Sequence, residues 1–228
     1  MTARQWVTAR QTAGLTQVQA ARALTISQPY LSQLENGIRI APPTLLQKAI
    51  DLYNVSPTAF PLPDAAQFTA VAPSRIERDL ASLGYPPFAH VRSAHRHNPA
   101  AVVFNAIIQP DLDTRLVEAL PWVLMQFPDL NWSWLRDNAK LHNAQNRLGY
   151  VIHLAKESAA KTGHRRQIQT LISWESDLEE ARLAREGTLC RDSMPARERE
   201  WLKVHRPAAA KHWKILTSLT SEQLPYAA

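Results

Sequence analysis

The sequence predicts an all-α protein, and three observations support this fold class. Glycine is scarce, at 6 of 228 residues, whereas alanine, leucine, arginine and glutamine, which favour helices, recur throughout. Residues that cap helices precede runs in which apolar side chains have helical spacing. Strand signals are nearly absent, and the chain has no internal repeat or low-complexity tract. We expect an N-terminal helical domain over residues 1–63, a linker over 64–73 and a larger helical domain over 74–228.

Five short helices are predicted in residues 1–63. They are a first helix ended by Gly14, a second over residues 17–24 capped by Thr16, a third capped by Ser27 and ended by Asn36-Gly37, a fourth from near Pro43, and a fifth from Pro57 to near Phe60. A tight turn around Thr25 and Ile26 joins the second helix to the third. Val18, Ala20 and Ala21 are predicted to face the neighbouring helices.

A run of specific residues accompanies this pattern. It comprises Gly14-Leu15-Thr16-Gln17, Ala20-Ala21 and the stretch from Ile26 to Gly37, and it continues from Pro43 to Phe60. In these residues the segment resembles the Cro/C1-type helix-turn-helix family, also called the XRE family. The resemblance covers about a quarter of the chain and implies a five-helix, lambda-repressor-like DNA-binding domain.

The resemblance also implies which side chains contact DNA. The candidates are Gln17, Ser27, Gln28, Tyr30, Ser32, Gln33, Asn36 and Arg39. Gln17 matches a phosphate-binding position at a helix N-terminus. Gln28 and Gln33 match positions that read base edges, where glutamine pairs bidentately with adenine.

The remaining candidates have less specific roles. Ser27 and Ser32 are expected near the floor of the groove, and Asn36 and Arg39 in the loop that grips the DNA backbone. For Tyr30, packing and phosphate contact stay equally open. Pro29 stands where the family often has a polar residue, so the operator sequence is not implied.

Other residues of this segment are expected to be structural. Glu35 is predicted to brace the domain through a cap or salt bridge rather than to touch DNA. The predicted core comprises Leu24, Ile26, Leu31, Leu34 and Ile50.

Charge is concentrated in the same segment. Residues 1–63 carry five basic and two acidic residues, whereas the other 165 residues carry 21 basic and 18 acidic ones. Half of the net charge of +6 therefore lies in about a quarter of the chain. A basic segment suits a polyanionic partner such as DNA.

Six or seven helices are predicted in the C-terminal part. They run from Ser74 to Gly84, from Pro99 to Ile108, from Asp111 with an interruption at Pro121, from Asn131 to Lys161 with a break near Asn143 and an end at Gly163, from Arg165 to Arg185, from Pro195, and from Pro207 through Trp213 to Leu219. No family resemblance assigns this part an activity.

Sequence signals for chemistry are sparse. Cys190 is the only cysteine, so an intrachain disulfide and a thiolate zinc cluster are excluded. We expect Cys190 to be an inert buried thiol, and the histidines His90, His95 and His97 to lie at the surface. The tryptophans between Trp122 and Trp134 are expected to belong to the core; the alternative for them is a partner-binding surface. The sequence contains no HExxH motif, P-loop or GxGxxG. We therefore expect no catalytic residues, no metal, no cofactor and no enzymatic activity.

The chain has no apolar run long enough to span a membrane and no signal-peptide core, so a cytoplasmic location without membrane contact is expected. The favoured function is a transcriptional regulator, a repressor that binds a palindromic double-stranded DNA operator as a homodimer. Its helical domain would serve dimerisation or the sensing of a partner or ligand. The alternative is an antitoxin that represses its own operon and neutralises a toxin through residues 64–228. An enzyme fused to a DNA-binding module is the third and least supported possibility.

Overall fold

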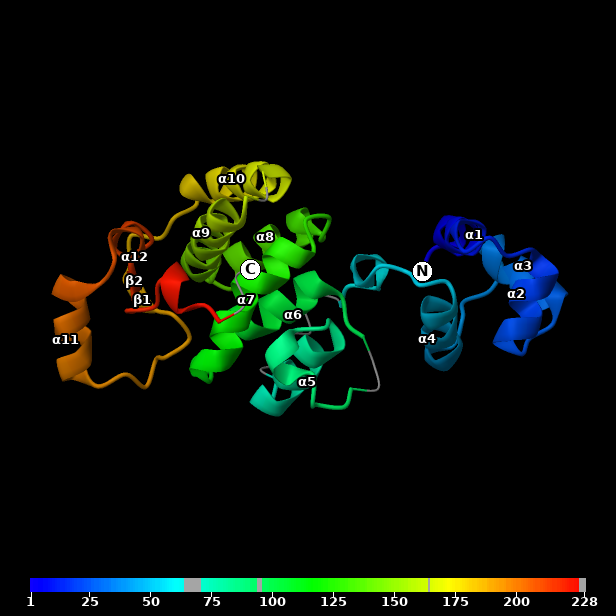
Figure 1. Ribbon diagram of the computed structural model, residues 1–228, viewed down its shortest axis with the longest axis horizontal. Coiled ribbons are helices and arrows are strands. Elements are labelled where there is room, and N and C mark those ends of the chain that lie inside the picture. Colours follow the sequence, from blue (N-terminus) through cyan, green and yellow to red (C-terminus); the bar gives the residue numbers. More distant parts are fainter. Residues whose placement is uncertain (64–70, 94–95, 164, 226–228) are drawn as a thin grey trace. The chain divides into compact units, whose positions relative to one another are not determined.

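The computed structural model describes residues 1–63, 71–93, 96–163 and 165–225 (Figure 1). These residues are mostly helical, which confirms the all-α fold class. The chain divides into two compact units, Met1–Pro61 and Leu62–Ala228. Most of the predicted linker, residues 64–70, lies outside the described residues.

Unit 1, Met1–Pro61, contains four α-helices and one 3₁₀ turn. They are α1 (Ala3–Thr12), α2 (Gln17–Leu24), α3 (Gln28–Glu35), α4 (Pro43–Leu52) and η1 (Pro57–Ala59). The first four helices lie where the sequence predicted them. The fifth is shorter than a full α-helix, because Pro57 opens it and its hydrogen bonds span only three residues. Trp6 packs edge-on against Tyr53, with ring centroids 6.2 Å apart, inside an apolar core that includes Leu31 and Leu34.

Unit 2, Leu62–Ala228, contains eight α-helices among its described residues, one more than the upper expectation. The elements are α5 (Pro73–Ser82), η3 (Pro86–Phe88), α6 (Pro99–Ile107), α7 (Thr114–Gln126), α8 (Trp132–Leu141), α9 (Gln145–Thr162), α10 (Arg165–Glu179), β1 (Gly187–Thr188), α11 (Ala196–His205), α12 (Ala208–His212), β2 (Ile215–Leu216) and η4 (Ser221–Gln223).

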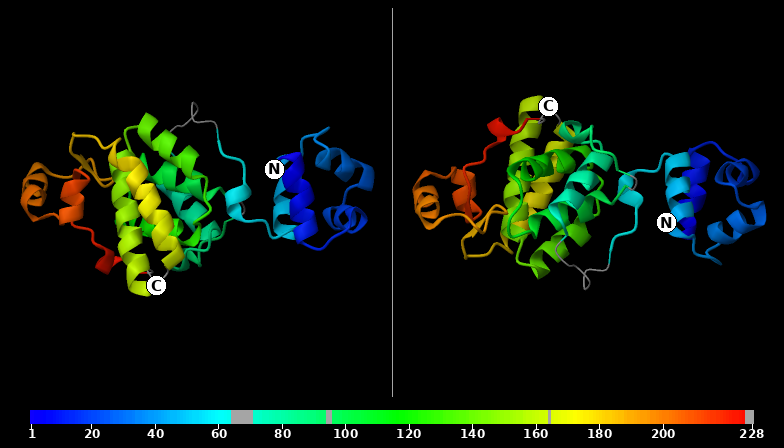
Figure 2. Two further views of the ribbon diagram at one scale, coloured as in Figure 1. Left: turned by 90° about the horizontal axis from the view of Figure 1, so that it is seen from above. Right: turned by 90° about the horizontal axis from the view of Figure 1, so that it is seen from below.

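The core of unit 2 is built around α6, in which every residue is buried. The long helices α9 and α10 lie side by side (Figure 2) and meet at Gly163, whose left-handed φ of 76° ends α9 as predicted. Asn143, with a φ of 56°, separates α8 from α9 at the predicted break. The half-buried tryptophans Trp122, Trp132 and Trp134 pack against this core, as the sequence indicated.

Three helix boundaries differ from the prediction. Ala72 rather than Ser74 is the N-cap of α5, and α10 ends at Glu179, well before Arg185. The helix expected from Asp111 begins at Thr114 instead, because the side chain of Asp113 accepts a hydrogen bond from the Arg115 amide and caps it.

Pro121 does not interrupt α7. A proline inside a helix costs about 3 kcal/mol, because it removes a backbone hydrogen bond and crowds the preceding turn. Here Pro121 is itself buried, and Leu120, Val123 and Leu124 are buried beside it. Burial of this apolar surface offsets the cost, so the helix continues.

The last predicted helix is also shorter than expected. It ends at His212, and Ile215–Leu216 form β2, which pairs in parallel with β1. Both strand residues of β2 are buried, so the segment that we expected to be helical contributes to a small sheet instead. Its partner lies 28 residues away along the chain, which a local pattern does not reveal.

Candidate nucleic-acid interface

The two helices of the predicted DNA-binding motif are held by local capping interactions. Thr16 and Gln19 form a capping box at the start of α2: the Thr16 Oγ1 accepts from the Gln19 amide, and the Gln19 Oε1 accepts from the Thr16 amide. Thr25 ends α2 with a left-handed φ of 60°, and the Ser27 Oγ caps α3 by accepting from the Tyr30 amide. The turn between the helices is therefore only three residues long.

Close packing of α2 against α3 depends on small side chains. Ala20 and Ala21 are buried, as predicted, but Val18 is 67% exposed, so its predicted inward position is wrong. In the short helix α2, the side chains that face inward are Ala20 and Ala21, two and three residues after Val18. Val18 itself points to solvent. Ile26 is only half-buried and packs at the edge of the core.

None of the predicted DNA contacts is buried. Exposed residues are Ser27, Gln28, Asn36 and Arg39, and half-buried residues are Gln17, Tyr30, Ser32 and Gln33. They come from the start of α2, from α3 and from the loop after α3. Glutamine side chains that stay accessible on a helix can present a donor and an acceptor to a base edge.

A chain of side-chain hydrogen bonds connects the starts of the two helices. The Gln28 Nε2 donates to the Gln17 Oε1 over 2.8 Å, and the Gln17 Nε2 donates to the Glu35 Oε2 over 2.7 Å. The Gln28 amide nitrogen has a second hydrogen, and the Gln28 Oε1 makes no hydrogen bond to the described residues. Gln28 is thus oriented by Gln17 while it keeps a free donor and a free acceptor.

Glu35 is the anchor of this chain. Its side chain is 3% exposed and accepts from the Arg10 Nε over 2.6 Å and from Nη2 over 3.1 Å. Arg10 also donates from Nη1 to the Leu15 carbonyl. Burial acts to raise the pKa of Glu35, but the hydrogen bonds from Arg10 and Gln17 outweigh it and hold the pKa below the ordinary value. The prediction that Glu35 braces the domain is confirmed.

Arg10 is the structural residue of this motif that sequence reasoning missed. It lies 25 residues from Glu35, and neither a capping pattern nor helical spacing links two residues so far apart.

The loop after α3 is also pre-arranged. Gly37 takes a left-handed φ of 72°, and the Asn36 Nδ2 donates to the Ser32 Oγ over 3.3 Å. The Arg39 guanidinium lies 5.6 Å from the centroid of the Tyr30 ring, within the range of a cation–π contact. Tyr30 therefore packs beneath Arg39.

The ion pair between Arg10 and Glu35 also raises the proportion of positive charge among the exposed charged residues of unit 1. Because the negative charge of Glu35 is buried against Arg10, the exposed charges of this unit are four basic residues and the acidic Asp51. The basic residues are Arg4, Arg22, Arg39 and Lys48. A polyanion that approaches unit 1 therefore meets an excess of positive charge.

A model for the helix-turn-helix family matches residues 8–60. This segment is a Cro/C1-type helix-turn-helix domain. The match ends before unit 2, and no match was found among curated proteins or among solved structures. The helix-turn-helix supports DNA binding and a role in transcription regulation for this chain.

Other predicted features lie in unit 2. Cys190 is fully buried, and burial raises its pKa to about 11, as expected of an inert thiol. His90 is exposed, as predicted, and His95 lies outside the described residues. His97 is half-buried and places its Nδ1 2.9 Å from the carboxylate of the buried Asp79, so the predicted surface position of His97 is only partly correct. Within the described ranges, no group of three histidine, cysteine or acidic side chains could hold a metal ion. No helix in the same ranges is long and apolar enough to cross a membrane.

Proposed function

We propose that this protein is a sequence-specific transcriptional repressor that binds a palindromic DNA operator as a homodimer. The observation that carries the proposal is the series of side-chain hydrogen bonds from Arg10 through Glu35 and Gln17 to Gln28. This series orients Gln28, an accessible glutamine at the start of α3. A helix that presents oriented amides at its N-terminal end suits base readout in the major groove.

In this proposal each predicted contact except Tyr30 has one role. Gln28 and Gln33 read base edges, with Ser27 and Ser32 beside them. Gln17 and the amides at the start of α2 bind a phosphate, while Asn36 and Arg39 grip the backbone. A bound dimer would repress by covering promoter DNA, and the proposal requires no catalytic step in unit 2.

The first prediction concerns binding itself. The full-length protein is expected to shift double-stranded DNA from the region upstream of its own gene, and binding is expected to weaken steeply with salt because phosphates are neutralised. Gel-shift titrations between about 50 and 200 mM salt measure both. No shift of that region, or of any sequence obtained by selection, at low salt would contradict the proposal.

The second prediction separates residues that read bases from those that hold the backbone. Gln28→Ala is expected to cost about 1–3 kcal/mol on the preferred operator and to relax preference at one base pair. Arg39→Ala is expected to weaken all sequences alike and to flatten the salt slope by about one unit. Binding-site selection and salt titrations on each variant measure the two effects.

Gln47→Ala serves as the control for this pair, because Gln47 lies on α4 and its side chain donates to Asp51, one turn along the same helix. It is expected to leave affinity and preference unchanged. If Arg39→Ala relaxed base preference while Gln28→Ala did not, the assignment of α3 to the groove would be wrong.

The homodimer part of the proposal rests on affinity. A domain of about 60 residues gains modest affinity from one half-site, and linking two raises avidity by about 10² to 10⁴. Sedimentation of the full-length protein at micromolar concentration tests self-association. If the protein is monomeric in this experiment and also binds its operator as a monomer, the homodimer is excluded.

A second candidate function is an antitoxin, which one surface of unit 2 favours. On α11, Trp201 is 53% exposed and Val204 is 78% exposed, and the Trp201 ring stacks on His205. Exposed tryptophan suits a protein partner such as a toxin. Co-expression with the product of the neighbouring gene distinguishes the functions: relief of that product's toxicity supports an antitoxin, and an innocuous product supports a repressor alone.

A further inference from the structure

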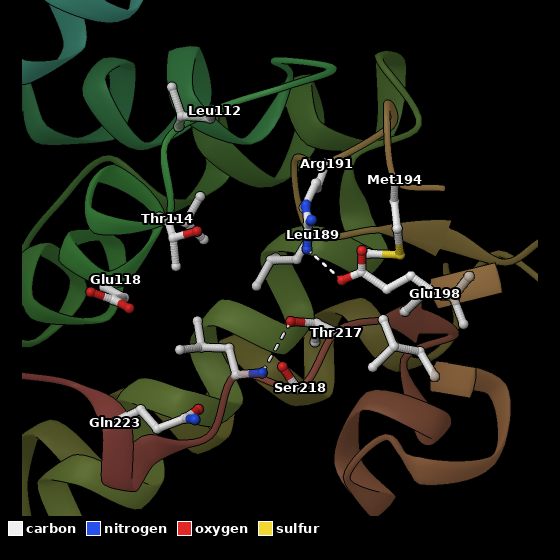
Figure 3. A pocket seen from close by; sticks show the side chains of 14 residues that line it. Leu112, Thr114, Glu118, Leu189, Arg191, Met194, Glu198, Thr217, Ser218 and Gln223 are labelled. Carbon is white, nitrogen blue, oxygen red and sulfur yellow. Dashed lines mark hydrogen bonds and ion pairs between the residues drawn. The ribbon is translucent and has the colours of Figure 1, made fainter. Parts of the chain in front are cut away.

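A pocket of about 200 Å³ lies in unit 2 where segments far apart in the sequence meet (Figure 3). Its walls come from α7, from the stretch after β1, from α11, and from β2 with the residues that follow it. The lining includes Val117 and Leu189, which belong to the main core of unit 2. It also includes Met194, Leu202 and Leu216, which form a separate small apolar cluster.

The pocket therefore borders two apolar clusters, and its lining also includes the polar side chains of Thr114, Thr217, Ser218 and Gln223. A pocket of about 200 Å³ has room for a benzene ring with a short substituent.

The charged side chains of the pocket are unequally matched. Glu198 accepts from Arg191 over 2.5 Å, so these two charges offset each other. Glu118 projects from α7 on the side of the pocket opposite Met194 and Glu198 (Figure 3) and has no hydrogen bond or ion pair to any described residue. The lining thus has one carboxylate in excess.

Glu118 lies in an environment that disfavours its charge. Its side chain is half-buried, and this burial, together with the negative charge of Asp113, raises its pKa above the ordinary value, although Arg115 acts against this. Asp113 and Arg115 pair with each other at 3.4 Å and are exposed, so Arg115 offsets the charge of Glu118 only in part. A cation beside Glu118 would supply the missing partner.

We propose that this pocket binds a small organic amine, with its ammonium group paired to Glu118 and its apolar body between Val117, Leu202 and Leu216. An anion would meet an unpaired carboxylate, and a neutral apolar molecule would leave that carboxylate without a partner. A metal ion lacks a ligand set here, since the described residues form no cluster of three suitable side chains. The inference goes beyond the proposed DNA-binding function and does not depend on it.

Calorimetric titration of the full-length protein with three probes of similar shape tests this inference. The probes are 2-phenylethylamine, 2-phenylethanol and 3-phenylpropanoate, at neutral pH. The amine is expected to bind at least tenfold more tightly than the alcohol, and the carboxylate is expected not to bind. This comparison uses the unchanged protein, so it does not depend on the folding of a variant.

Glu118→Gln keeps the size of the side chain and removes its charge, and it is expected to abolish the preference for the amine over the alcohol. Glu180→Gln is the matched control, because Glu180 is an exposed acid outside the pocket, and it is expected to keep the preference. The inference is overturned if the amine fails to bind at millimolar concentration, if the carboxylate binds as tightly, or if Glu118→Gln retains the preference. Titration reads binding directly, so its outcome is separate from that of the gel-shift experiment.

Discussion

Replacing Gly149 with alanine is expected to destabilise unit 2 by about 3 kcal/mol, at the upper end of the usual cost of overpacking a core. Gly149 lies in α9, where an exposed glycine-to-alanine change would stabilise the helix by about 1 kcal/mol. Here an alanine Cβ would lie 2.3 Å from Cζ3 of Trp213 and 2.4 Å from Cε3. Trp213 is fully buried, so its ring has no free space to move into.

Denaturant unfolding of the full-length protein, followed by tryptophan fluorescence, measures this effect. Six of the seven tryptophans belong to unit 2, so the signal reports mainly on that unit. Gly187→Ala is the matched control, because a Cβ at Gly187 meets no atom within 4 Å. It is expected to change the free energy of unfolding by less than about 0.5 kcal/mol.

A double-mutant cycle identifies the cause of the loss. Trp213→Leu removes the ring that the new Cβ would strike, so Gly149→Ala is expected to cost less in that background than in the original protein. Equal costs in both backgrounds would show that the clash with Trp213 is not the cause of the loss. A Gly149→Ala protein as stable as the original would show that α9 and Trp213 move apart without penalty.

Most helix boundaries could be predicted because their signals are local. Thr16 and Leu24 bound α2 in the structure as in the prediction, and Gly163 ends α9. Capping depends on side chains within three or four residues of the helix end, so the sequence alone contains the information. The break at Asn143 is of the same kind, since asparagine tolerates a left-handed backbone.

The errors arise where distant residues decide the structure. Ile215 and Leu216 read as part of a helix, but pairing with Gly187 and Thr188 makes them a strand. Pro121 reads as a helix break, but burial within the core of unit 2 keeps α7 continuous. Neither outcome follows from neighbouring residues.

The candidate DNA-binding site shows the same division. Its residues could be named from the motif, since the motif itself is a local run from Gly14 to Gly37. The link from Arg10 to Glu35, and through Gln17 to Gln28, needs the fold, because it joins α1, α2 and α3. The pocket beside Glu118 could not be predicted at all, because its walls come from segments up to about a hundred residues apart.

Breaking the Arg10–Glu35 pair is expected to destabilise unit 1 by about 3–5 kcal/mol, because removal of one partner leaves the other charge buried. Arg10→Met leaves the carboxylate of Glu35, whose side chain is 3% exposed, with only Gln17 as a partner. Hydrogen–deuterium exchange in α1–α4 of the full-length protein measures the loss. Arg22→Met, at an exposed arginine with no ion pair to any described residue, is the control and is expected to be nearly neutral.

Two further measurements separate the ion pair from packing. The double variant Arg10→Met, Glu35→Leu leaves no unpaired charge and is expected to recover most of the stability that Arg10→Met loses.

Acidification tests the carboxylate of Glu35 directly. Because the pKa of Glu35 is lowered in the folded state, its contribution is complete above the ordinary glutamate pKa of about 4.5 and is lost as the pH falls below that value. Glu35→Gln is therefore expected to flatten the fall in unit 1 stability below about pH 4.5. The pair would be shown not to stabilise the domain through its charge by either of two results. One is a Glu35→Gln protein whose unit 1 loses as much stability at low pH as the original protein does; the other is a double variant no more stable than Arg10→Met.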